Sequence, residues 1–147
     1  MEDVKRSGPF TSVNGDRAYL NKFFLDYFKN FIGNGVFIDP STSLQVLAST
    51  GLTVTVKKGN AFINGLTHLG DFDKTLTLDS GDNVLPRIDK IVLKADRLSR
   101  TITKEIKKGV PASNPVAPVL VRNEDAWELG LATINVAKAV APATVNL

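Results

Sequence analysis

The residues of this chain that could do chemistry are few, and they lack the companions that known sites need. His68 is the only histidine among 147 residues and there is no cysteine, so a multi-histidine or thiolate metal site is excluded. Asp71 and Asp73 are spaced like the first ligands of a calcium loop, but the glycine and the distal glutamate do not follow at the needed positions. A hydrolase that used His68 would also need a nucleophile and an orienting acid. We therefore expect no metal site and no catalytic residue.

The glycines of the sequence offer no cofactor motif either. Gly33-Asn34-Gly35 resembles the start of a dinucleotide-binding loop, but it follows a predicted helix rather than a strand and lacks the third glycine. It predicts the end of a helix and a tight turn. The chain also contains no phosphate-binding loop, no G-x-S-x-G and no H-E-x-x-H. We expect a protein that is not an enzyme and that binds no cofactor.

Eight basic residues between positions 85 and 109 are the best candidate site for an acidic partner. A net charge of +3 and a pI of about 9.2 are compatible with nucleic-acid binding. Three acidic residues interrupt the run, however, and it contains no aromatic ring on which a base could stack. A nucleic-acid-binding β-barrel that uses the 87–108 hairpin stays open as an alternative. The basic residues are Arg87, Lys90, Lys94, Arg97, Arg100, Lys104, Lys107 and Lys108, and the acidic ones are Asp89, Asp96 and Glu105.

The same run is better explained as a solvated structural hairpin. Its charges alternate with β-branched residues, which keeps an exposed strand soluble and discourages edge-to-edge pairing. Lys104 lies on the same side of its strand as Ile102 and Ile106, so we expect it to point inward. An inward-pointing lysine is one known way of protecting a sheet edge from pairing with another strand. Residues 96–99, between the two strands, suit a hairpin loop.

The elements that position these residues begin with a helix rich in aromatic side chains. Asp16 is suited to cap its N-terminus and Gly33 to end it. Between them, apolar residues recur at helical spacing and make a stripe broader than one core face usually needs. Two interpretations stay open: one wide core face, or a face shared between the chain's own sheet and another subunit. The stripe contains Tyr19, Leu20, Phe23, Phe24, Tyr27, Phe28 and Phe31.

Short strands separated by turn signals make up the rest of the sequence. Residues 52–56 alternate apolar and polar side chains and predict a strand with one buried face. Asn64-Gly65 predicts a two-residue hairpin turn. The face of the last strand changes parity, which a bulge near Gly130 or Thr133 would explain. Strands are predicted within residues 43–49, 51–59, 61–65, 74–82, 87–95, 100–108 and 126–138.

This pattern predicts a mainly β fold, an antiparallel β-sandwich preceded by one N-terminal α-helix. Residues 1–36 form the arm and helix, and residues 37–147 form the sandwich, in one compact unit. The proline-rich segment 109–120 predicts an extended surface crossing rather than a ladder strand. No apolar run is long enough to span a membrane. The N-terminus lacks an apolar signal region, so we expect a protein that is not secreted.

Three groups of residues stand out by their order and spacing. They are Arg87-Ile88-Asp89 with Ile91-Val92-Leu93, then Lys108-Gly109-Val110-Pro111-Ala112 with Pro115 and Pro118, and then Glu128-Leu129 with Leu131-Ala132. On these groups the chain resembles a family of tail-tip and baseplate proteins from tailed bacteriophages (siphophages). The resemblance covers nearly the whole chain from about Gly8, and the chain is similar to small tail-region proteins of phages that infect Bacillus.

The resemblance implies a β-sandwich "shoulder" like that of the receptor-binding proteins of lactococcal siphophages. In those proteins the module is trimeric and attaches the adhesion device to the baseplate, while a separate C-terminal head binds host saccharide. We expect no such head here, which favours an oligomerising docking or connector module. The expected partners are further copies of the chain, with a trimer the best guess, and other tail-tip proteins. The expected location is the virion tail, or the infected-host cytoplasm during assembly.

The expected interface combines the aromatic helix with one charged pair. Arg87 and Asp89 are two residues apart on a strand and share a face, so they could make a rim contact within or between subunits. An exposed pair that contributes little is the alternative. A saccharide-binding module is the remaining alternative, but the strand parity of Trp127, the single tryptophan, indicates burial. The candidate interface residues are Tyr19, Phe23, Phe24, Tyr27, Phe28, Phe31, Arg87 and Asp89.

Overall fold

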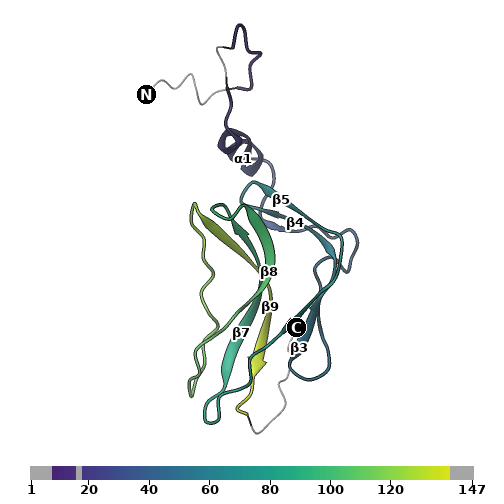
Figure 1. The fold of residues 1–147 in the computed structure, drawn as a ribbon, viewed down its shortest axis with the longest axis vertical. Helices are drawn as coiled ribbons and strands as arrows, with labels where there is room; N and C mark the ends of the chain where they lie inside the picture. The colour runs from purple at the N-terminus through teal and green to yellow at the C-terminus, as the bar shows by residue number, and fades with distance from the viewer. Residues whose placement is uncertain (1–7, 16–17, 140–147) are drawn as a thin grey trace.

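The computed structural model describes residues 8–15 and 18–139, and within them the fold is mainly β, with three antiparallel sheets and one short helix (Figure 1). This confirms the predicted fold class. No helix in these ranges is long and apolar enough to cross a membrane. The elements are α1 (Asn21–Lys29), β1 (Gly35–Val36), β2 (Val46–Ala48), β3 (Thr53–Val56), β4 (Gly59–Ile63), β5 (Leu66–Gly70), β6 (Lys74–Thr77), β7 (Arg87–Asp96), β8 (Thr101–Lys107) and β9 (Ala126–Val136).

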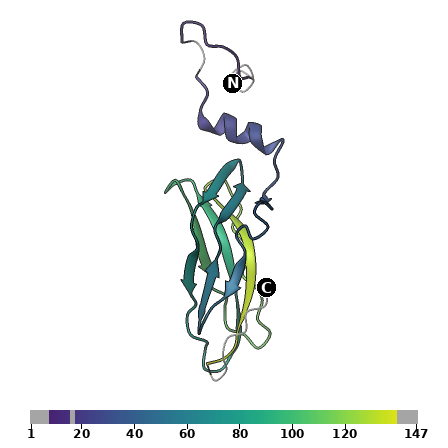
Figure 2. The same cartoon turned by 90° about the vertical axis from the view of Figure 1, so that its right-hand side faces the viewer.

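The strands form two layers. The sheets β1-β4-β5 and β2-β3-β6 belong to one bent layer, because β3 continues into β4 and β5 into β6 after short bends. The sheet β8-β7-β9 forms the other layer (Figure 2). All strand pairs are antiparallel in the described residues. The helix lies beyond one end of this sandwich (Figure 1).

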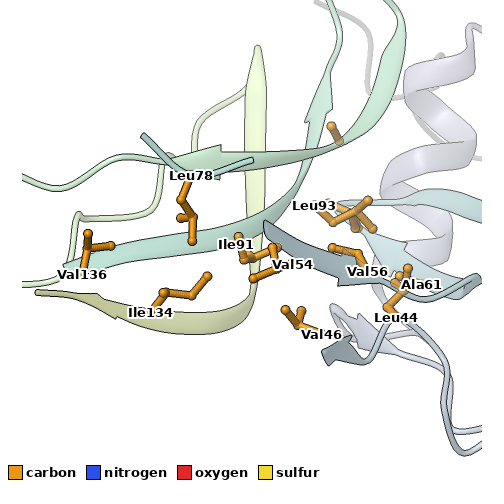
Figure 3. Close-up of a cluster of buried hydrophobic side chains, with 12 residues drawn as sticks. Leu44, Val46, Val54, Val56, Ala61, Leu78, Ile91, Leu93, Ile134 and Val136 are labelled. Atoms are coloured by element: carbon orange, nitrogen blue, oxygen red, sulfur yellow. The ribbon is translucent and has the colours of Figure 1, made fainter. Parts of the chain in front are cut away.

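The core fills the space between the layers with aliphatic side chains (Figure 3). Val54 and Val56 are fully buried, as the alternation of residues 52–56 predicts. Ile91 and Leu93 face them from β7 on the opposite layer. Because strand residues alternate between faces, each layer contributes every second residue. The buried cluster contains Leu44, Val46, Val54, Val56, Ala61, Ile63, Leu78, Ile91, Leu93, Ala95, Ile134 and Val136.

The local turns agree with the sequence predictions. Ile63 pairs with Leu66 across the Asn64-Gly65 turn, whose two residues have φ angles of 49° and 89°. Positive φ at both central positions is the geometry of a type I′ hairpin turn. The β7–β8 hairpin also closes over a four-residue loop, since Asp96 pairs with Thr101. Segment 108–121 contains no strand.

A bulge in β9 corrects the parity change of the last strand. Ile91 pairs with Ala132, but the next residue, Val92, pairs with Gly130, which leaves Leu131 as the extra residue. The bulge therefore lies beside Gly130, one of the two predicted positions. It lets both halves of β9 turn apolar residues toward the core.

The helix is shorter than expected, and the prediction that Gly33 ends it is wrong. Leu20 stands at the N-cap without a side-chain hydrogen bond, and the predicted cap Asp16 lies outside the described residues. The C-cap is Asn30. The amides of Asn30 and Phe31 donate to carbonyls three residues back, so a tightened last turn satisfies the end of the helix without a left-handed glycine.

Candidate functional site

The aromatic face of α1 and its flanks is not buried by the chain's own core. No residue of α1 is buried, and none of the stripe belongs to the core cluster. Leu20 is 77% exposed and Phe31 70% exposed, and Phe24, Tyr27 and Phe28 are also exposed. Tyr19 and Phe23 are half-buried. The interpretation of the stripe as one wide core face is therefore wrong.

The other side of α1 approaches the sandwich. A Cβ on Gly65, in the β4–β5 turn, would lie 2.6 Å from the carbonyl oxygen of Leu25 and 2.9 Å from its Cα, so this glycine permits close contact with the helix. Lys22 and Lys29 form ion pairs with Asp26, at 3.0 and 3.3 Å. At about 100° per residue, these charged residues lie opposite the middle of the aromatic stripe. They also hold the pKa of Asp26 below its usual value, chiefly through the Lys22 hydrogen bond.

The aromatic rings of this face order one another. Tyr19 and Phe23 have ring centroids 4.8 Å apart, and Tyr27 and Phe31 are separated by 5.0 Å. The hydroxyl of Tyr19 accepts a hydrogen bond from the Phe10 amide at 2.8 Å. Tilted and edge-on ring pairs at such distances are worth about 0.5–1.5 kcal/mol each beyond burial. The contacts among these rings therefore order the face within the single chain.

Arg87 and Asp89 pair within the chain, but they do not form a rim. Both are buried, and Arg87 Nε donates to Asp89 Oδ1 at 3.0 Å. The guanidinium also donates to the carbonyls of Ser80 (2.7 Å) and Asp79 (2.6 Å), and Asp89 accepts from the Gly109 amide (2.8 Å). These groups belong to the loop before β7 and the start of segment 108–121. The pair thus fastens both segments to β7, and the expectation of an exposed contact is wrong.

Glu128 makes a second buried tie that the sequence did not reveal. Its Oε2 accepts hydrogen bonds from Lys107 Nζ at 2.6 Å and from the Val121 amide at 2.7 Å. Strand alternation places Glu128 opposite Trp127 and Leu129, on the outer face of β9, where a carboxylate is expected to be solvated. Segment 108–121 covers that face instead. Glu128 therefore holds the covering segment in place.

Lys104 points inward, as predicted, and closes the bend of the other layer. Its Nζ donates to the carbonyls of Lys57 (3.1 Å) and Phe72 (3.0 Å), which lie in the two bends. Burial lowers the pKa of Lys104, while the charge of Asp73 opposes that shift. Lys104 therefore links β8 to both bends through hydrogen bonds, in addition to protecting the edge of the sheet.

Asp73 and His68, which were considered for metal binding and catalysis, both lie among structural contacts of the sandwich. Asp73 accepts from Lys57 Nζ (2.6 Å) and from the Lys58 amide (2.7 Å), which together lower its pKa. His68 has a buried Nε2 without a hydrogen-bond partner in the described residues, and burial, followed by the charge of Lys104, lowers its pKa. Within residues 8–15 and 18–139, no group of three or more metal-ligating side chains occurs.

The glycine motif and the tryptophan also lie in structural positions. The Asn34 side chain accepts a hydrogen bond from the Asn64 amide, and Gly35 begins β1. This contact joins the post-helix turn to the β4–β5 hairpin. Trp127 packs partly against the core, with the Arg122 guanidinium 5.7 Å from its ring centroid.

Half of the eight basic residues of this run form ion pairs inside the chain, and a fifth, Lys104, is buried. Lys107 pairs with Glu128 at 2.6 Å and Lys108 with Asp79 at 2.7 Å. Lys94 lies 3.8 Å from Asp96. Arg87 and Lys104 are buried. Since these cations are compensated or inaccessible, the hairpin presents far less free positive charge than its sequence indicates. This supports the structural explanation of the run.

Comparisons with known proteins add no relative to this geometry. No protein-family model matches the chain, and neither the curated proteins nor the solved structures contain a match. The function proposed for the chain therefore rests on its own residues and contacts and on the resemblance described from its sequence.

Proposed function

We propose that this protein is a non-enzymatic structural component of the siphophage tail-tip or baseplate type, acting as an oligomerising docking module. The observation that carries the proposal is the preformed aromatic face of α1, which is turned away from the chain's own core. Obligate interfaces are more apolar than other surfaces, and interfaces in general are enriched in aromatic residues. The resemblance to shoulder modules of phage adhesion proteins supplies the class of assembly.

The size of the exposed face supports association. Its exposed apolar side chains present roughly 500 Å² per chain. Covering that area is worth about 12 kcal/mol before the costs of association and ordering are subtracted. Those costs are about 4–15 kcal/mol for lost translation and rotation alone. The burial of one face is of the same size as the cost of association. An oligomer in which every copy buries its own aromatic face against the others is therefore more stable than one in which a single face is buried.

The width of the face favours more than two copies. The aromatic residues within α1 run from Phe23 to Phe28 around about 140° of the helix at 100° per residue. An amphipathic helix that faces one core typically has a stripe a little over 100° wide. A helix in a three-helix cluster contacts two neighbours at once. A trimer, with the α1 helices at its centre, is therefore the assembly we propose.

The sandwich then serves as a rigid connector. The buried ties at Arg87, Lys104 and Glu128 fix the loops and the crossing segment to the sheets. A sandwich fixed in this way would hold the α1 cluster and a neighbouring tail-tip protein at a constant distance and orientation. We place the protein in the virion tail, or in the host cytoplasm during assembly.

Mass spectrometry of gradient-purified particles of the phage that encodes the chain tests this function. Peptides of the chain should be recovered in a fixed, small integral ratio to a tail-tip protein of the same particle. Purified tail-assembly intermediates should be examined in parallel. Absence of the chain from both finished particles and intermediates would contradict the proposal.

A further inference from the structure

Besides the helix face, the molecule exposes two smaller apolar surfaces on different sides of the sandwich. One lies on segment 108–121, which covers the outside of the β8-β7-β9 layer. The other lies between the end of α1 and residue 38, beside β1 in the opposite layer. Figure 1 shows segment 108–121 on the left of the sandwich and the chain that follows β1 on the right. Neither surface is used by the chain's own core.

The first surface is the valine ridge, formed by Val110, Val116 and Val119. All three are exposed, and Val119 is 84% exposed. Val116 and Val119 are three residues apart, the number of residues per turn in an extended proline-rich chain, so they share one edge of the segment, and a bend at residues 113–114 separates them from Val110. The segment is fastened beneath that edge, since the amide of Ala112 donates to the Pro86 carbonyl at 3.0 Å and the Val121 amide to Glu128. The valines are therefore presented by a fixed backbone.

The second surface is the post-helix strip, formed by Ile32, Val36, Phe37 and Ile38. All four are exposed, and Ile38 is 87% exposed. Strand β1 pairs with β4 alone among the described strands, so its second edge faces outward. Residues 30–38 contain no charged side chain, and the same is true of residues 109–121. Neither segment therefore contributes a charged side chain of its own that would oppose an apolar contact.

We propose that the valine ridge of one copy of this chain docks on the post-helix strip of the next copy. The two surfaces match in size, because each presents roughly 400 Å² of apolar side chain. With the helix face, the strip and ridge bring the apolar area to more than the roughly 800 Å² per partner of a standard interface. A contact between two different patches is head-to-tail, and repeated around an axis it closes a ring. The inference rests on the proposed self-association and adds its second contact.

Sedimentation-velocity ultracentrifugation of full-length charge variants tests the contact. Ile38→Glu and Val119→Glu should each raise the dissociation constant of the oligomer at least tenfold, because each places a carboxylate in an apolar contact. Ile38→Glu combined with Val119→Lys should recover association to within a few-fold of wild type, since the new charges would meet across the interface. Ile38→Glu combined with Val119→Glu should not recover. Val84→Glu, at a valine 73% exposed outside both surfaces, should leave association unchanged.

The outcomes separate this contact from the helix interface. Association that survives Val119→Glu and Ile38→Glu but is lost in Phe24→Ser/Phe28→Ser would overturn the ridge-and-strip contact and leave the proposed self-association intact. Failure of the Glu–Lys combination to recover association beyond either single glutamate variant would also overturn the direct contact. A wild-type chain that stays monomeric would overturn both. Circular dichroism of each variant confirms that the sandwich is folded.

Discussion

The sandwich and α1 distribute their polar and apolar side chains in opposite ways. Between and around its sheets, the sandwich buries Arg87, Asp89, Lys104 and Glu128, each with hydrogen-bond partners from the chain itself. The helix exposes aromatic rings and turns Leu25 toward the sandwich. The sandwich therefore pairs these four buried charged groups internally, whereas the core does not cover the aromatic face of α1. This difference is the reason why we propose that α1 contacts a partner.

The largest effect should come from breaking the buried charge pair. Asp89→Asn leaves the Arg87 guanidinium without its carboxylate, and removal of one partner of a buried pair costs about 3–5 kcal/mol of unfolding free energy. Urea denaturation measures this loss. Asp79→Asn is the matched control, because its carboxylate pairs with Lys108 at the surface and should contribute less than about 1 kcal/mol. Similar small losses in both variants would contradict the role given to Asp89.

Glu128→Ala should have the next largest effect. It leaves Lys107 and the Val121 amide without their acceptor, which should cost about 2–3 kcal/mol. Hydrogen exchange should speed up within segment 108–121, because that segment loses its fastening. Glu124→Ala, in the exposed turn before β9, serves as the control. Unchanged exchange in segment 108–121 would show that Glu128 does not hold it.

The pH dependence linked to His68 should be smaller. Its pKa is lowered in the folded chain by burial and by Lys104, against a weaker opposing effect of Asp71. The unfolded state therefore binds the proton more readily, so stability is fully present above the unfolded pKa of about 6.5 and falls as pH drops toward the folded pKa. Thermal melts of wild type and His68→Gln between neutral and mildly acidic pH check this. A His68→Gln variant that loses as much stability as wild type over this range would contradict it.

The hairpins and the inward lysine follow from local sequence. Asn64-Gly65 specifies its turn through positive φ at both positions. The parity of Lys104 within β8 places it inward, because strand side chains alternate. The alternation of residues 52–56 likewise predicts which valines enter the core. These features depend on neighbours within a few residues, so the sequence determines them well.

The ties and the orientation of α1 do not follow from local sequence. Burial of the Arg87–Asp89 pair depends on the carbonyls of residues 79 and 80 and on the amide of Gly109. Burial of Glu128 depends on a segment that crosses its face. Alternation alone predicts a solvated Glu128. For α1, helical spacing identifies an apolar face but does not determine what that face meets. That depends on tertiary contacts such as the close approach of Leu25 to Gly65.

Sedimentation velocity of the wild-type chain and of Phe24→Ser/Phe28→Ser, over a wide range of concentration, tests the central claim most directly. Wild type should sediment as an oligomer whose population follows mass action. The double variant should sediment as a monomer or aggregate, while the cooperative unfolding of its sandwich persists, because neither phenylalanine belongs to the core. A wild-type monomer at every concentration, or a double variant that associates as the wild type does, would contradict the proposal that the aromatic face is an interface.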